Sequence, residues 1–184
     1  GSHTTLKLAS DKMVVFNANV AGTIGATIAL EVEEYVSRGF HNRGNYLFSD
    51  GKSLTPNGAD IFINGNRYTL IDNAQDLMAS NCSHCALSRD IDFGNISGGA
   101  LLFDRVLTGL GHSLYNINFS PDQNYSRAIF QVNTGVIRDL TIAGGRINRP
   151  DASTVGSLSS QNSGVIWGVA STIDVTGLDG VGGL

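Results

Sequence analysis

Two strand-like segments, residues 111–119 (GHSLYNINF) and 135–143 (GVIRDLTIA), decide the fold prediction because they repeat one pattern of apolar residues. The apolar positions recur 23 residues later and match Leu114 with Ile137, Ile117 with Leu140, and Phe119 with Ile142. A looser third copy follows around Ile166 and Val169. Periods of roughly 20–50 residues are typical of stacked repeats, in which neighbouring copies cover each other's apolar faces. We therefore expect the matched positions to stack in one continuous hydrophobic interior.

The composition favours many short strands joined by tight corners. Charged residues make up only 15% of the 184 residues, against about 25% in an average globular protein. The chain has 23 glycines but only 3 prolines. Exposed helix faces need Lys and Glu, whereas Gly and Asn supply the backbone conformations of tight corners. The predicted class is all-β, with one short helix and loop excursions.

Charge and hydropathy exclude two classes of partner. The net charge of −4 gives no electrostatic support for nucleic-acid binding, and no basic cluster is present that would dock on anionic lipid. No run approaches the roughly 18 apolar residues of a membrane-spanning helix, so we expect no membrane insertion. Residues 1–3 (GSH) resemble a cleaved-tag remnant and are left out of the fold reasoning. The final VGGL reads as an interrupted repeat, which suggests a piece of a longer protein.

The first of two expected units covers residues 4–58. Short apolar runs and alternating apolar residues predict strands around 6–8, 13–16 and 28–32. The Gly-, Asn- and Ser-rich residues 37–58 predict a loop.

The second expected unit covers residues 59–184. Asn64-Gly65 between two apolar runs predicts a hairpin. Asp72, three residues before Gln75, predicts a capping box for a short helix over 73–79. The remaining pattern predicts further strands at 85–93, 101–106 and 165–175, and a loop excursion at 150–163.

The two cysteines lie together in the sequence Cys82-Ser83-His84-Cys85, which allows three interpretations. They are a local disulfide, a redox pair, or half of a zinc site with His84. A zinc site needs four ligands and a second Cys/His pair is missing, while a thioredoxin-like pair belongs in a βαβ unit that the pattern does not show. A local disulfide that pins one loop is therefore the favoured interpretation, and we expect no metal and no cofactor.

Four segments in order resemble the repeat region of filamentous-haemagglutinin-like exoproteins, the adhesins exported by two-partner secretion. The segments are 68–78 (YTLIDNAQDLM), 85–92 (CALSRDID), 109–117 (GLGHSLYNI) and 135–142 (GVIRDLTI). The similar part covers about residues 60–184, and residues 6–32 resemble simpler strand repeats of the same proteins. The resemblance implies a right-handed parallel β-helix, with aligned aliphatic side chains inside.

The same resemblance implies a function in cell adhesion and virulence. The chain would belong to a protein secreted to the bacterial cell surface through an outer-membrane transporter, with a host cell-surface protein or glycan as its partner. Residues 55–58 (TPNG) match the Asn-Pro-Asn-Gly motif of the family's secretion domain only in part, so this piece is not identified as that domain. Cysteine is rare in the family, which makes the Cys82/Cys85 pair a departure from it.

Candidate contact residues lie in loops and at polar positions of strands. Loops 37–58, 80–86 and 150–163 are expected to face a partner. Aromatic residues are enriched at contact hot spots, and the candidates among them are Tyr46, Phe48, Tyr115 and Tyr125. Four Asn-X-Ser sequons mark surface turns and candidate glycosylation sites at Asn81, Asn95, Asn118 and Asn124.

An enzyme is the alternative, because parallel β-helices also carry polysaccharide lyases and hydrolases that use clustered carboxylates. Asp90 and Asp92 share one strand face and would bind calcium or a sugar acid; the wider set adds Asp104, Arg105, Arg138 and Asp139. The simpler interpretation makes these acids outward residues of an amphipathic strand, with Arg138 and Asp139 on a solvated edge and His112 bonded to the backbone at a corner. No catalytic residue is assigned. A purely structural stalk of a toxin-delivery exoprotein is the third candidate.

Overall fold

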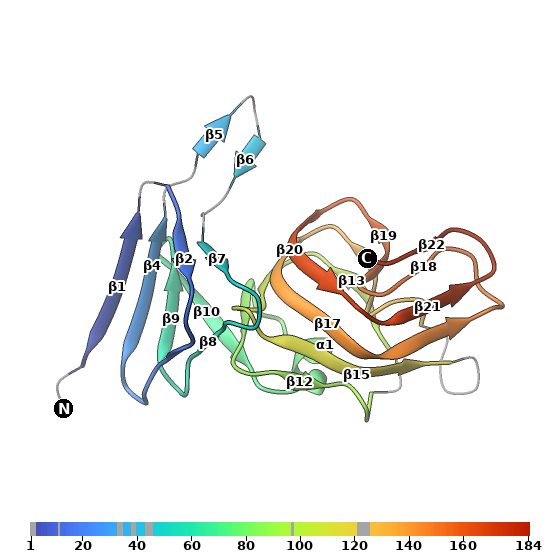
Figure 1. Cartoon of the computed structure of the whole chain (residues 1–184), viewed down its shortest axis with the longest axis horizontal. Helices are drawn as coiled ribbons and strands as arrows, with labels where there is room; N and C mark the ends of the chain where they lie inside the picture. Colours follow the sequence, from blue (N-terminus) through green and yellow to red (C-terminus); the bar gives the residue numbers. More distant parts are fainter. Residues whose placement is uncertain are drawn as a thin grey trace.

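The computed structural model describes residues 3–10, 12–32, 35–37, 40–42, 46–96, 98–120 and 126–184. The chain is mostly β, with one short helix, and its strands pair mainly in parallel (Figure 1). Strands that pair are usually separated by a full set of other strands in the sequence. We call each such set, from one strand to the next strand that pairs with it in parallel, a pass of the chain.

The first passes form the N-terminal part. Their strands are β1 (Thr5–Ser10), β2 (Val14–Phe16), β3 (Val20–Ala21), β4 (Thr27–Val32), β7 (Tyr46–Phe48), β8 (Leu54–Thr55) and β9 (Asp60–Ile63). Parallel pairing joins β1 to β4, β4 to β9, β2 to β7 and β3 to β8. Between β4 and β7, β5 (Tyr35–Ser37) and β6 (Phe40–Asn42) pair antiparallel and project from the body in Figure 1.

The direction of the strands in the large sheet reverses at the hairpin between β9 and β10 (Asn66–Ile71). The two strands pair antiparallel, and Asn64 and Gly65 between them have φ angles of 50° and 77°. Two consecutive positive φ angles are the requirement of a type I′ turn, which explains the Asn-Gly sequence. The predicted hairpin is confirmed. Since β10 is parallel to β11 (His84–Leu87), all later passes run opposite to the first ones.

The C-terminal part contains three sets of stacked strands. Its elements are α1 (Ala74–Ala79), β12 (Ile91–Asp92), β13 (Ala100–Phe103), β14 (Val106–Thr108), β15 (Ser113–Phe119), β16 (Phe130–Asn133), β17 (Val136–Arg149), β18 (Val155–Gly156), β19 (Ser159–Asn162), β20 (Val165–Ser171), β21 (Asp174–Gly177) and β22 (Val181–Gly182). Parallel pairing gives the series β11–β14–β17–β20, β12–β15–β17–β21 and β13–β16–β19, and it also joins β18 to β22.

The register differs from the one that the 23-residue match predicts. Leu114 pairs with Ile142, whereas Ile137 pairs with Leu107 in the previous pass and with Ile166 in the next. The physical reason is a corner with positive φ, which recurs 29 residues apart at Leu110, Asp139 and Gly168. The segment 111–119 follows this corner, whereas the segment 135–143 contains it at Asp139. The expected pairs Leu114/Ile137 and Ile117/Leu140 are therefore wrong, although apolar residues do align with apolar residues.

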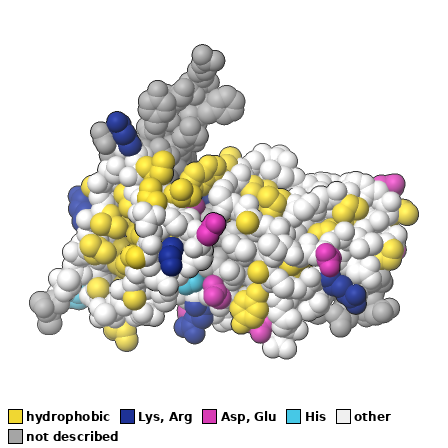
Figure 2. All heavy atoms as spheres, viewed as in Figure 1, with side chains coloured by type: hydrophobic (Ala, Val, Ile, Leu, Met, Phe, Trp, Pro, Cys, Tyr) yellow, Lys and Arg dark blue, Asp and Glu magenta, His cyan; other side chains and the backbone are white. Residues whose placement is uncertain are grey.

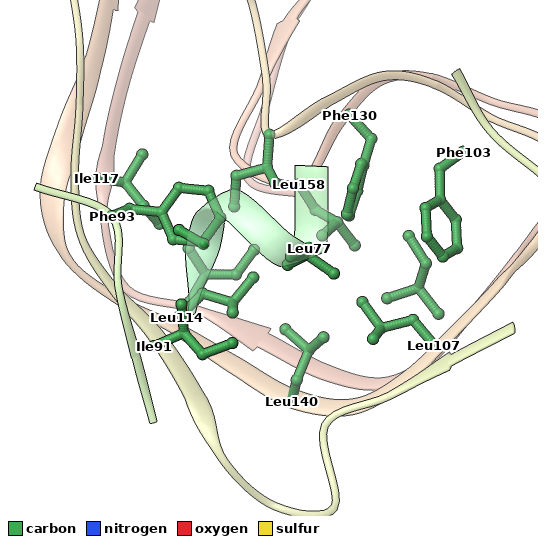
Figure 3. Close-up of a cluster of buried hydrophobic side chains, with 14 of the residues drawn as sticks. Leu77, Ile91, Phe93, Phe103, Leu107, Leu114, Ile117, Phe130, Leu140 and Leu158 are labelled. Carbon is green, nitrogen blue, oxygen red and sulfur yellow. The ribbon is translucent and has the colours of Figure 1, made fainter. Parts of the chain in front are cut away.

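The interior of the C-terminal part is filled by side chains from all three sets of strands. Figure 3 shows Ile91, Leu114, Leu107 and Leu140 directed at the same interior as Leu77 of α1. Each of these five side chains is at most 3% exposed. Full burial of such a side chain stabilises a fold by roughly 1.5–3 kcal/mol, so the stacking of passes supplies the main stabilising term.

The short helix begins one residue later than the sequence predicts. Asn73, not Asp72, is the N-cap: its Oδ1 accepts the backbone N–H of Asp76 at 2.9 Å, and its Nδ2 donates to Asp76 Oδ2 at 2.7 Å. Asp72 instead accepts the hydroxyl of Ser88, which fixes it to the neighbouring strand. A competing partner thus removed Asp72 from the capping position.

Two predicted loops are corrected. Residues 46–55 contain β7 and β8, and Leu54 is fully buried. Residues 150–163 contain β18 and β19, with Val155 and Leu158 buried. Polar residues and glycines surround these short strands, yet the buried apolar residues Tyr46, Leu54, Val155 and Leu158 place both stretches in the stack.

Candidate functional site

A surface groove follows one corner of the stack through consecutive passes. Its lining comes from residues 81–83, 104–106, 134–136 and 163–165, and its volume is about 750 Å³. Backbone hydrogen bonds hold the corners together: Val136 N donates to the carbonyl of Arg105 at 2.7 Å, and Val165 N donates to the carbonyl of Gly135 at 2.8 Å. Neighbouring corners are therefore separated by one strand spacing, about 4.8 Å.

One side of the groove is a row of aligned valines, the valine ladder, and buried asparagine side chains hold the corners behind it in place. Val106 pairs with Val136, and Val136 pairs with Val165, so three valines repeat along it. Beneath the turn, Asn133 is fully buried and its Nδ2 donates to Asn162 Oδ1 at 2.7 Å. These amides satisfy each other and the adjacent backbone, which fixes the corners relative to one another.

The groove's charged pair is Asp104 and Arg105. Arg105 Nε lies 3.6 Å from Asp104 Oδ1, with the two side chains 22% and 60% exposed. The guanidinium carbon lies 5.9 Å from the centre of the Phe103 ring. In the part of the chain that the structure describes, this ion pair and ring contact are the guanidinium's partners, and it makes no hydrogen bond. Arg105 thus offers hydrogen-bond donors beside the carboxylate of Asp104, which is a hydrogen-bond acceptor.

Cys82 lines the same groove and is joined to Cys85 by a disulfide, with Cα atoms 5.7 Å apart. Cys85 is buried in β11, and the ring of His84 beside it packs against Tyr68 at a centroid distance of 5.2 Å. Among the described residues, no group of three or more His, Cys, Asp or Glu side chains is placed to hold a metal ion. The cysteines therefore fix the start of β11 beside the groove.

Asp90, Asp92 and His112 form bonds between passes. Asp90 Oδ1 accepts the backbone N–H of Ser113 at 2.8 Å, and Asp92 Oδ1 accepts Asn116 Nδ2 at 3.0 Å. His112 is 5% exposed; its Nε2 lies 3.1 Å from the carbonyl of Leu54 and its Nδ1 lies 3.3 Å from Asp90 Oδ1. The predicted backbone bond of His112 is present. Both carboxylates carry structural hydrogen bonds.

Arg138 and Asp139 are buried, which corrects the prediction of a solvated edge. Their exposed fractions are 7% and 4%, and Arg138 Nε donates to Asp139 Oδ2. The Arg138 guanidinium lies between two rings, 3.8 Å from the centre of Tyr46 and 4.6 Å from that of Trp167. Its Nη2 donates to the carbonyl of Tyr46 at 3.0 Å. This cluster joins β7 to β17 and β20, and pairs 92 positions apart carry no local sequence signal.

Burial changes the ionisation of this cluster. Desolvation raises the pKa of Asp139 to about 6, although the charge and hydrogen bond of Arg138 lower it. Desolvation also raises the pKa of Tyr46 well above its ordinary range, and its hydroxyl donates to Thr108 Oγ1 at 3.0 Å. Tyr46 is therefore a neutral hydrogen-bond donor inside the protein.

The candidate contact aromatics have different environments. Tyr46 is 1% exposed, so the expectation that it faces a partner is wrong: its ring is needed beneath Arg138. Phe48 is half-buried and stacks on Phe16 at a centroid distance of 4.5 Å. Tyr115 is 40% exposed and is available for contact. Tyr125 lies outside the described residues.

The sequons fall at several places on the surface. Asn81 is exposed and lines the groove. Asn95 is exposed as well, and the serine of its sequon lies outside the described residues. Asn118 is exposed, but its Nδ2, the atom that a glycan would modify, donates to Asn116 Oδ1 at 3.1 Å. Asn124 lies outside the described residues. Of the described sequon asparagines, Asn81 is the one that lines the candidate site.

Charged side chains are sparse on the face shown in Figure 2, and apolar side chains gather over the N-terminal strands. The exposed apolar residues of that part of the chain include Leu6, Met13, Val15 and Leu47. Among the described residues, no helix has the length and apolar composition needed to cross a membrane. No protein-family model, curated protein or solved structure matches this chain significantly.

Proposed function

We propose that this chain is a non-enzymatic segment of a secreted bacterial adhesin of the filamentous-haemagglutinin-like type. Its passes are the coils of a right-handed parallel β-helix, a rigid scaffold that presents corners and loops to a host cell-surface protein or glycan. The full-length protein would be exported through an outer-membrane transporter of a two-partner secretion system and would act at the bacterial cell surface.

The observation that carries the proposal is the parallel pairing of successive passes around apolar cores, one among the N-terminal strands and one among the C-terminal strands. β14, β17 and β20 align Leu107, Ile137 and Ile166 in order, and the corner recurs every 29 residues. Such a stack buries its apolar residues only against neighbouring passes, which is the physical basis of an elongated scaffold. The exposed corners at 104–106, 134–136 and 163–165, which line the groove, are then free to bind.

The engagement of the acidic residues favours a scaffold over an enzyme. Asp90 and Asp92, the best carboxylate candidates, accept hydrogen bonds from the next pass through Ser113 N and Asn116 Nδ2. A general acid or base must instead reach a substrate proton directly or through one water. Asp92→Ala should therefore weaken stacking without removing any catalytic activity.

Binding of the labelled full chain to host epithelial cells and to a glycan array tests the proposal. We expect saturable binding that unlabelled protein competes away and that heat-unfolded protein does not show. Turnover of a polysaccharide that Asp92→Ala abolishes would establish the enzyme instead. Blank cell-binding and glycan assays with correctly folded protein would leave the structural stalk of a toxin-delivery exoprotein as the function.

A further inference from the structure

The groove along the corners 81–83, 104–106, 134–136 and 163–165 combines features that suit one class of ligand. It is built from the most regular part of the fold, where each pass contributes one corner. Its length spans four corners, and so three strand spacings of about 4.8 Å each. An extended chain molecule that lies along the stack would meet equivalent positions at regular intervals.

Three of the four corners contribute both a polar group and a valine. Ser83, Thr134 and Ser163 provide hydroxyls at three of the four corners, and Asp104 is the polar residue that follows Ser83 at the remaining one. The Val106–Val136–Val165 ladder runs along the last three corners. A sugar ring has an apolar face of C–H groups and an edge of hydroxyls. The ring face fits the valines and the hydroxyl edge fits the polar corners, whereas a uniformly apolar ligand would leave the polar groups unpaired.

Asp104 and Arg105 give this groove chemical selectivity. Their charged atoms lie 3.6 Å apart, and Arg105 is 22% exposed, so most of its side chain is already held against the protein. In the described part of the chain the guanidinium has no hydrogen-bonded partner, while it carries five N–H donors. A pair of adjacent sugar hydroxyls matches this arrangement: one donates to the carboxylate and its neighbour accepts from the guanidinium.

We propose that this groove binds an uncharged oligosaccharide, with adjacent hydroxyls on Asp104 and Arg105 and ring faces on the valine ladder. The inference rests on the proposed function and names the ligand class for one of its surfaces. An acidic sugar fits less well, because its carboxylate would meet Asp104 next to Arg105 and because the protein carries a net charge of −4. No aromatic residue among the lining residues is present for a sugar ring to stack on, so the dissociation constant is expected near the millimolar range.

The test uses the full chain and a set of neutral and sialylated or uronate-containing oligosaccharides. Binding is followed by isothermal titration and by NMR of the valine methyl groups. We expect a neutral oligosaccharide to shift the methyl signals of Val106, Val136 and Val165. Asp104→Ala and Arg105→Gln should each weaken binding at least tenfold, and Arg105→Gln keeps enough side chain to pack on Phe103.

Arg89→Gln is the matched control, because Arg89 is also an arginine in an exposed ion pair but lies outside the groove. It should leave binding unchanged. Tighter binding of acidic sugars, or neutral binding that neither groove variant weakens, would overturn the inference while the adhesin proposal stands. A blank titration at millimolar sugar also overturns it, and host-cell binding then decides separately whether the adhesin proposal survives.

Discussion

Replacing Gly135 by alanine should separate adjacent passes at the groove. Gly135 lies at a corner without a positive φ, so a methyl group there causes no backbone strain of its own. The added Cβ would lie 2.1 Å from the carbonyl oxygen of Arg105 in the pass beneath. An ordinary C···O contact is about 3.3 Å or longer, so the two passes would have to separate by roughly 1 Å.

That displacement acts on two hydrogen bonds, from Gly135 N to Phe103 O at 3.1 Å and from Val136 N to Arg105 O at 2.7 Å. Weakening them costs up to about 1 kcal/mol each, and overpacking adds roughly 1–3 kcal/mol. We expect Gly135→Ala to lower the free energy of unfolding by about 2–4 kcal/mol in urea titrations followed by circular dichroism. Gly164→Ala should behave alike, because its Cβ would lie 2.1 Å from the carbonyl oxygen of Gly135.

Gly183→Ala is the control, since an added Cβ at this exposed position meets no atom within 4 Å. If Gly135→Ala and Gly183→Ala differ by less than about 0.5 kcal/mol, the corners are not stacked as closely as the structure has them.

Phe130 is fully buried, so Phe130→Ala should lower the free energy of unfolding by about 3–5 kcal/mol in the same titration; a loss below 1 kcal/mol would contradict its place in the interior. Reductant should break the Cys82–Cys85 bond and lower the free energy of unfolding by about 2 kcal/mol. A variant with serine at both positions should keep the same free energy of unfolding with and without reductant. An equal loss in that variant would show that the disulfide is not the cause of the destabilisation. The pKa of Asp139 is raised to about 6, so the folded state binds this proton more tightly than the unfolded state. The stability from this group should be fully present below pH 4 and lost as the pH rises through 6, by about 3 kcal/mol. The urea midpoint of the wild type should fall as the pH rises from 4 to 7, and this pH dependence should disappear in Asp139→Asn. An unchanged pH dependence in Asp139→Asn would mean that another group causes it.

Local chemistry made parts of the fold predictable. Asn64-Gly65 specifies its turn through two positive φ angles, and the hairpin forms there. The strand at 113–119 was also predictable, because Leu114, Ile117 and Phe119 define one buried face. These features depend on a few neighbouring residues, so a short stretch of sequence contains all the information.

Features that depend on distant partners were not predictable. The predicted register was wrong because the 23-residue match runs across the corner at Asp139, whereas the matching stretch 111–119 begins after the corner at Leu110. Neither residue is a glycine, so the first two copies of the corner lack the signal that Gly168 gives in the third. Arg138 was expected on a solvated edge, yet Tyr46 and Trp167 cover it from segments far along the chain. The groove is likewise assembled from four separate corners.

The constant distance between corners has an evolutionary consequence. The 29 residues from Leu140 to Gly168 make up one whole pass, so tandem duplication of the DNA that encodes residues 140–168 would lengthen the stack and keep every later side chain in phase. Loss or gain of a single codon within a strand would turn the following side chains from inside to outside. Selection should therefore tolerate whole-unit copy-number changes and confine small insertions to segments between strands.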